Sequence, residues 1–126
     1  MSIIWKTEIT AVGPDVADLA EGGVVIFFET GAPPELAEVS VLHRRSALSP
    51  DVDPVPGSRI EIGPLQAFIT AVGEKAWAKV REIGHVVVNF NGAMTTDRPG
   101  EICATAVEGD VLSAALVTGT TVTIIA

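Results

Sequence analysis

Short apolar runs separated by glycine and proline place the strongest limit on how this chain can fold. Ile3–Val12 and Ser58–Ile62 alternate apolar and polar side chains, which is the pattern of a strand with one buried face. Val24–Phe28 and Val86–Phe90 are apolar on both faces, as in strands that are covered on both sides. The chain contains about eight such extended segments, and the linkers between them are short.

One segment has a helical pattern instead. Its apolar residues fall on a single stripe at helical spacing, and they are Ala76, Trp77, Val80 and Ile83. Gly84 follows as a residue suited to a left-handed C-terminal cap. We therefore expect an all-β fold, a small closed barrel of about six to eight strands with one short α-helix at about residues 74–83, because closure removes exposed strand edges. No shift in composition and no internal repeat divides the chain, so residues 1–126 are expected to form a single domain.

Charge and cysteine content exclude several classes of function. The 126 residues include 16 acidic and 8 basic side chains, for a formal net charge of -8. Nucleic-acid binding requires a basic surface, so it is not expected. Cys103 is the only cysteine, which excludes an intrachain disulfide and fits a reducing compartment. The N-terminus lacks the pattern of a signal peptide, and no apolar run approaches the roughly 20 residues of a spanning helix. We expect a cytoplasmic protein that is not inserted in a membrane.

Most catalytic and metal-binding motifs are absent from the sequence. Cys103 lies in an expected strand and has no nucleophile signature around it. The two histidines and the cysteine are too far apart for a zinc motif, and neither a phosphate-binding loop nor a dinucleotide-binding glycine pattern is present. Asp51 and Asp53 belong to a proline-rich loop without the multi-ligand pattern of a calcium site. We expect no metal and no cofactor.

His43 and His85 remain as candidates for chemistry. If residues 39–45 are extended, Val41, His43 and Arg45 share one face of a strand. Partial burial favours the neutral, nucleophilic imidazole, and a nearby arginine suits an incoming phosphate. His85 directly follows Gly84, at the start of the next strand. Both histidines also have a structural interpretation, in which each satisfies one hydrogen bond in a strand or loop, and their spacing does not show whether they meet.

A set of motifs extends over almost the whole chain. They are Thr7–Gly13, Phe28–Pro33, Glu35-Leu36, His43, Pro56-Gly57, Ile69–Gly73, Arg81–Val86, Phe90–Gly92 and Pro99-Gly100. The specific part is their combination: a Gly-Ala-Pro loop, a histidine shortly after it, and Ile-Gly-His-Val further on. In these motifs the chain resembles the IIA component of the glucitol/sorbitol-specific phosphotransferase system (PTS). It departs from the family pattern at Thr30, where an acid is frequent, and at Thr118-Gly119, where Pro-Gly is frequent.

The resemblance implies a phosphocarrier, that is, a histidine phosphotransferase component of sugar transport. The general protein HPr, phosphorylated on histidine, would pass its phosphoryl group to His43, and His43 would pass it to a cysteine of the IIB unit. The IIC membrane unit would then take up sorbitol (glucitol) as it is phosphorylated. Arg45 and His85 would steady the phosphoryl group, without metal or cofactor. The resemblance leaves open whether the chain forms a homodimer. The alternative is a non-catalytic barrel that regulates or binds a ligand, and the presence of His43 favours the carrier.

Overall fold

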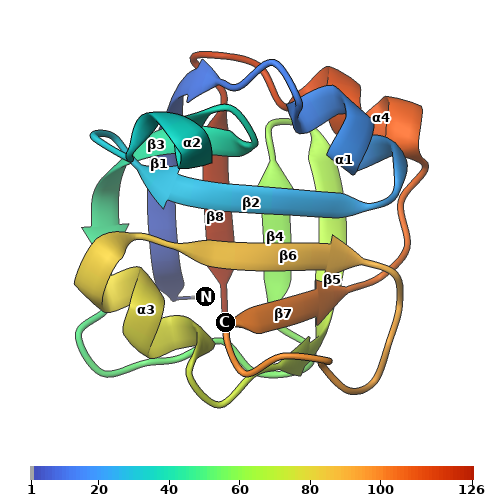
Figure 1. Ribbon diagram of the computed structural model, residues 1–126. Helices are drawn as coiled ribbons and strands as arrows, with labels where there is room; N and C mark the ends of the chain where they lie inside the picture. Colours follow the sequence, from blue (N-terminus) through green and yellow to red (C-terminus); the bar gives the residue numbers. More distant parts are fainter. Residues whose placement is uncertain (1) are drawn as a thin grey trace.

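A computed structural model describes residues 2–126, in which eight strands form one closed barrel (Figure 1). The strands are β1 (Ile3–Val12), β2 (Val24–Glu29), β3 (Ser40–Leu48), β4 (Arg59–Ile62), β5 (Leu65–Val72), β6 (Val86–Phe90), β7 (Glu101–Ala104) and β8 (Thr121–Ile125). Around the barrel they follow the order β1-β3-β2-β6-β7-β5-β4-β8. The closed barrel expected from the sequence is confirmed. Among the described residues, no helix is long and apolar enough to cross a membrane.

Four short helices accompany the barrel, where the sequence predicts one. The expected helix is α3 (Ala76–Ile83), and Gly84 caps it in the left-handed conformation with φ 65°. Two segments with weak helical signals form α1 (Val16–Glu21) and α2 (Pro34–Ala37). A fourth helix, α4 (Gly109–Ala115), packs on α1, and the prediction of a single helix did not include it. Gly109 signals a turn in the sequence, but it is needed for this packing, because a Cβ there would come within 2.7 Å of Glu21 Cα.

The strands pair in two directions. Most neighbours are antiparallel, including the β4–β5 hairpin that closes at the predicted Gly63-Pro64 turn. The β2–β3 and β6–β7 pairs are parallel instead. A parallel pair requires a crossover, since its two strands must be entered from the same end. The chain between β2 and β3 contains the loop of residues 30–33 and then α2, and together they provide that crossover.

Six of the eight strands form two similar halves, which leave out β4 and β8. In the first half-barrel (β1, α1, β2 and β3) the first strand pairs antiparallel with the last, which runs parallel to the second. The second half-barrel (β5, α3, β6 and β7) has the same arrangement, and β2 joins β6 antiparallel between them (Figure 1). The pentapeptide Ile-Thr-Ala-Val-Gly occurs at the same place in both, as Ile9–Gly13 and Ile69–Gly73. The expectation of no internal repeat is therefore wrong, and this shared pentapeptide is the signal that indicates one.

Aromatic rings fill one part of the barrel interior. Trp5 packs edge-on against Phe27, with ring centroids 5.7 Å apart, and against Trp77, with centroids 5.8 Å apart. All three side chains are almost completely buried. Trp77 comes from α3, so the helix closes this part of the core. The candidate histidine His43 lies in the same aromatic cluster.

Candidate functional site

His43 lies on β3, between the neighbouring strands β1 and β2. Its register partners are Ile9 on β1 and Glu29 on β2. The side chain is 0% exposed, and its ring packs edge-on against Trp5 and Phe27, with centroids 5.3 and 6.1 Å away. The sequence predicts a half-buried histidine at the end of an apolar face. The ring is in fact buried completely, because the aromatic cluster covers it from inside the barrel.

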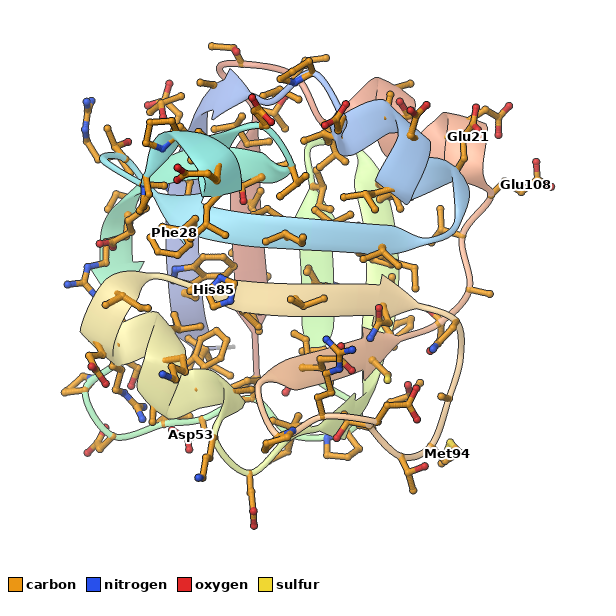
Figure 2. All side chains as sticks on the ribbon, in the orientation of Figure 1. Glu21, Phe28, Asp53, His85, Met94 and Glu108 are labelled. Atoms are coloured by element: carbon orange, nitrogen blue, oxygen red, sulfur yellow. The ribbon has the colours of Figure 1, made fainter. Side chains whose placement is uncertain are left out.

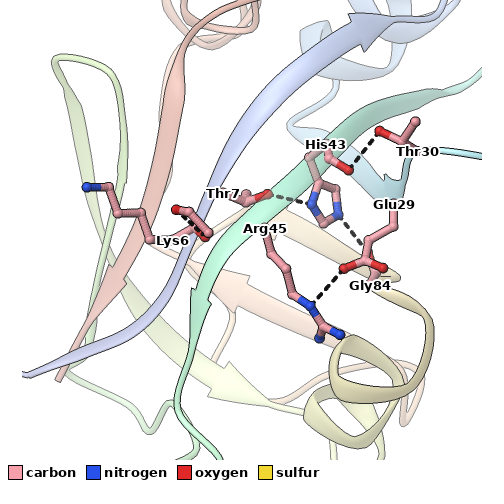
Figure 3. Close-up of polar contacts among 8 residues, drawn as sticks. Lys6, Thr7, Glu29, Thr30, His43, Arg45 and Gly84 are labelled. Atoms are coloured by element: carbon pink, nitrogen blue, oxygen red, sulfur yellow. Dashed lines mark hydrogen bonds and ion pairs between the residues drawn. The ribbon is translucent and has the colours of Figure 1, made fainter.

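Both ring nitrogens of His43 have a hydrogen-bond partner (Figure 3). Nδ1 lies 2.7 Å from Thr7 Oγ1, and Nε2 lies 2.7 Å from the carbonyl oxygen of Gly84. A carbonyl oxygen only accepts, so Nε2 must carry a proton and donate it to Gly84. In the neutral ring Nδ1 then has the lone pair and accepts the Thr7 hydroxyl proton. These two partners select one tautomer of the imidazole.

Burial also keeps the imidazole uncharged. It lowers the pKa of His43 below the ordinary histidine value of 6.5. The bond to the Gly84 carbonyl and the charge of Glu29 raise the pKa and oppose part of this effect, whereas Arg45 lowers it. Desolvation is the largest of the four influences. At neutral pH the imidazole is therefore neutral, with an unprotonated Nδ1 that accepts from Thr7, and the neutral ring is the form in which imidazole is a nucleophile.

An ion pair joins β3, the strand that carries His43, to the neighbouring strand β2. Arg45 Nε lies 3.2 Å from Glu29 Oε1, and the two side chains are 40% and 30% exposed. Arg45 is the register partner of Thr7, and Glu29 is that of His43. A surface hollow of about 250 Å³ is lined by Glu29, Thr30, His43, Arg44 and Arg45. His43 therefore borders a surface hollow that also contains the ion pair.

Gly84 is required at this site for two reasons. Its φ of 65° is left-handed, which favours glycine. In addition, a Cβ at this position would collide with Glu29 Cγ, so the Glu29 side chain lies directly on Gly84. The αL cap that ends α3 thus brings the Gly84 carbonyl to His43 Nε2 and leaves room for Glu29 beside it.

His85 lies on the other face of β2 from the His43 ring. Its Nδ1 lies 3.2 Å from the Phe27 carbonyl oxygen, and its ring packs against Phe28 with centroids 5.1 Å apart (Figure 2). Phe27 contacts His43 from inside the barrel, and successive strand residues point to opposite faces. The structure therefore does not bring the two rings together, and the contact it gives His85 is the carbonyl bond of the structural interpretation. The two histidines are connected through the Gly84 backbone.

Sequence reasoning missed the polar partners of His43. Thr7 is 36 residues away in the chain, and Gly84 is 41 residues away. One feature of the sequence could have identified Thr7. It is the single polar residue between Trp5 and Ile9 on the buried face of an alternating strand. No group of three or more histidine, cysteine or acidic side chains within residues 2–126 is placed to hold a metal ion.

The comparison of the two half-barrels shows that only one of them carries this site. Ile9 pairs with His43 in the first, and Ile69 pairs with Ala104 in the second. In the same way Glu29 pairs with His43, whereas Phe90 pairs with Ala104. A methyl group and a phenyl ring thus replace the imidazole and the carboxylate. The repeated fold supplies the scaffold, and the polar site is a feature of the first half-barrel.

Comparisons with known proteins identify the family from sequence and a similar fold from a solved structure. A family model described as "PTS system glucitol/sorbitol-specific IIA component" matches residues 4–123. The glucitol/sorbitol-specific EIIA components of Shigella flexneri and Escherichia coli K12 are each 32% identical over 102 residues, which is 81% of this chain and 81% of each relative. A crystal structure of a PTS IIA component from Enterococcus faecalis V583 has a TM-score of 0.76 at 20% identity, covering 96% of this chain and 99% of that one. The chain belongs to the family of glucitol/sorbitol-specific IIA components of the phosphotransferase system.

Proposed function

We propose that this chain is a phosphocarrier that accepts a phosphoryl group from phospho-HPr on His43 and passes it to the IIB unit. One observation carries the proposal: a fully buried, neutral imidazole has its tautomer fixed by two hydrogen bonds, next to a cation at a surface hollow. Phosphoryl transfer needs a nucleophile held in line and positive charge around the phosphoryl oxygens. His43 supplies the first and Arg45 the second.

Arg45 is proposed to exchange its partner during transfer. Its guanidinium pairs with Glu29 in the resting protein, and the pair is partly exposed, so it contributes only about 0–1 kcal/mol of stability. A phosphoryl group carries more negative charge than one carboxylate and offers three acceptor oxygens. Arg45 can therefore leave Glu29 for the phosphoryl group at little cost. His85 would act indirectly, by holding the strand next to Gly84 through its bond to Phe27.

The partners follow from the family. The proposed donor is phospho-HPr, the proposed acceptor is a cysteine of the IIB unit, and the IIC unit completes uptake and phosphorylation of the sugar. Glucitol (sorbitol) is the proposed sugar, since the relatives in Shigella flexneri and Escherichia coli carry that specificity in their names. We propose that residues 1–126 act as a single cytoplasmic domain, which the free, buried Cys103 fits.

Phosphorylation in a purified system tests the proposal. The chain is incubated with HPr, its phosphorylating enzyme and labelled phosphoryl donor, and the acid-labile label is mapped to a peptide. We expect stoichiometric label on the peptide that contains His43, and none on a folded His43→Ala variant. A second step adds the IIB unit, which should remove the label. A folded wild-type chain that takes up no label would overturn the phosphocarrier proposal and favour the non-catalytic barrel.

A further inference from the structure

The two nitrogens of the His43 ring have chemically opposite surroundings. Nε2 faces an acceptor, the Gly84 carbonyl oxygen, and the Glu29 side chain lies directly on Gly84. Nδ1 faces a hydroxyl donor, Thr7, whose register partner on β3 is Arg45 (Figure 3). Nε2 thus has an acceptor and Nδ1 a donor, while the Arg45 guanidinium pairs with Glu29 in the resting protein.

We propose that Nδ1 of His43 is the nitrogen that carries the phosphoryl group. The Thr7 hydroxyl releases Nδ1 as the phosphoryl group arrives and then donates its proton to a phosphoryl oxygen. The inference deepens the proposed function and rests on it. The first argument is the tautomer. Because the Gly84 carbonyl requires a proton on Nε2, the lone pair of the neutral ring is on Nδ1 before the donor arrives. Attack from Nδ1 needs no prior proton transfer.

The step balances without any further reactant. The Nδ1 lone pair forms the new N–P bond, the N–P bond of the phosphohistidine donor breaks, and its electron pair returns to the donor nitrogen. The His43 ring keeps its Nε2 proton and becomes a phosphoimidazolium. Its positive charge is stabilised by the acceptors already in place, the Gly84 carbonyl and the nearby Glu29 carboxylate. Transfer to the IIB cysteine reverses the change on the ring.

Thr7 is suited to this role because its hydroxyl group can rotate about the Cβ–Oγ1 bond and donate a hydrogen bond in a new direction. In the resting protein its proton is directed to Nδ1 at 2.7 Å. Once a phosphoryl group occupies Nδ1, the same proton can be donated to a phosphoryl oxygen after rotation about one bond. Arg45, beside Thr7 in the strand register, approaches the same anion when it leaves Glu29.

Attack from Nε2 would meet three obstacles. The bond to the Gly84 carbonyl must break, and the ring proton must move to Nδ1 first. The phosphoryl anion must then approach the Glu29 carboxylate, and like charges at short range repel. The left-handed Gly84 cap, packed against Glu29, leaves the carbonyl little freedom to withdraw. At Nδ1 the hydrogen bond from the Thr7 hydroxyl must be given up, but no ring proton has to move and no carbonyl has to withdraw.

Nuclear magnetic resonance of the phosphorylated protein decides between the two nitrogens. The chain is labelled with ¹⁵N-histidine, phosphorylated through HPr, and examined by long-range ¹H–¹⁵N correlation spectra, in which the phosphorylated nitrogen is identified by its shift and its coupling to phosphorus. We expect the Nδ1-phosphorylated form of His43, and an Nε2-protonated ring before phosphorylation. The Nε2-phosphorylated form would overturn this inference while leaving the phosphocarrier function intact. Absence of phosphohistidine at position 43 would overturn both.

Three threonine variants test the role of the hydroxyl. Thr7→Val removes it at constant shape, and we expect phosphoryl acceptance in single-turnover experiments to slow by about tenfold or more, as for the loss of a hydrogen bond to a charged group. Thr7→Ser keeps the hydroxyl and should restore most of the rate. Thr70→Val in the second half-barrel is the matched control, because it removes a 2.6 Å bond to the Ala93 carbonyl away from His43. An unchanged rate in folded Thr7→Val, or a loss in Thr7→Ser equal to that in Thr7→Val, would contradict the role. If Thr7→Val does not fold, the Thr7→Ser rate and the wild-type spectra still decide.

Discussion

His43 and Ala104 occupy equivalent positions in the two half-barrels. Each pairs with the first isoleucine of an Ile-Thr-Ala-Val-Gly strand, Ile9 or Ile69. Ala104 is completely buried, so the same backbone accepts a methyl group at this place without loss of the fold. The imidazole is therefore not required to build the strand.

This equivalence leads to the first prediction, for His43→Ala. The variant should remain folded, because the second half-barrel has alanine at the matching position. It should lose roughly 1–3 kcal/mol of unfolding free energy, since Thr7 and the Gly84 carbonyl are left without their partner. It should accept no phosphoryl group. Circular dichroism, chemical denaturation and labelling by phospho-HPr measure the three effects, and undiminished labelling would remove His43 from the assignment.

The second prediction compares two adjacent arginines. Arg45 pairs with Glu29 beside His43. Arg44 also lines the hollow, but it is the adjacent residue in the strand, so its Cβ points to the opposite face. Arg45→Ala should slow phosphoryl acceptance about tenfold, and Arg44→Ala should have the smaller effect, because a charge-assisted bond to phosphate is lost only in the first. Single-turnover rates with phospho-HPr provide the comparison. Equal effects would mean that both guanidinium groups reach the phosphoryl group.

The third prediction concerns stability and pH. The pKa of His43 is lowered in the folded protein, below 6.5, mainly by burial. The unfolded chain therefore binds a proton at a higher pH than the folded one, so protonation favours unfolding. The stabilising contribution of the neutral ring is fully present above the unfolded pKa and is lost as the pH falls from about 6.5 toward the folded pKa. Below the folded pKa no further loss from this group occurs.

Denaturation of the wild type and of His43→Ala between about pH 5 and 7 isolates this contribution. The two proteins share every other ionisable group, so the difference between the two curves reports on His43. We expect the stability of the wild type to fall more steeply toward acid than that of the variant. Parallel curves would show that the buried ring has the same pKa in the folded and unfolded chains.

The strands and the barrel could be predicted from the sequence because they depend on local patterns. The alternation of apolar and polar residues predicts β1 at its observed limits, Ile3–Val12. The helical stripe of apolar residues predicts the start of α3 to within two residues of Ala76. α4 escaped prediction because it is held by packing on α1, and its Gly109 has the local signature of a turn. Long-range packing of this kind leaves little trace in the nearby sequence.

The site was predictable only in part, for a related reason. His43 stands out because it is a histidine in an apolar run, whereas Thr7 and Gly84 become visible only when strands distant in sequence are paired. His85 has an equally clear sequence signal, a histidine directly after a glycine cap, yet its ring lies on the other side of β2. The sequence identifies candidate site residues, and the closure of the barrel determines which of their side chains come into contact.

The last prediction separates the two interpretations of His85. Its Nδ1 lies 3.2 Å from the Phe27 carbonyl, and its ring covers Phe28 on the face of β2 opposite His43. If this contact is purely structural, His85→Gln should lower the melting temperature and leave the rate of transfer per folded molecule unchanged. If His85 also positions the Gly84 carbonyl, with which it shares a peptide bond, the Nε2 bond of His43 should weaken and transfer should slow by roughly ten- to a hundredfold. Lys79→Gln, at an exposed position of α3, is the matched control, and melting curves measured with single-turnover transfer distinguish the outcomes. We expect the slower transfer, and a loss of melting temperature alone would leave His43, Thr7 and Arg45 as the residues of the site.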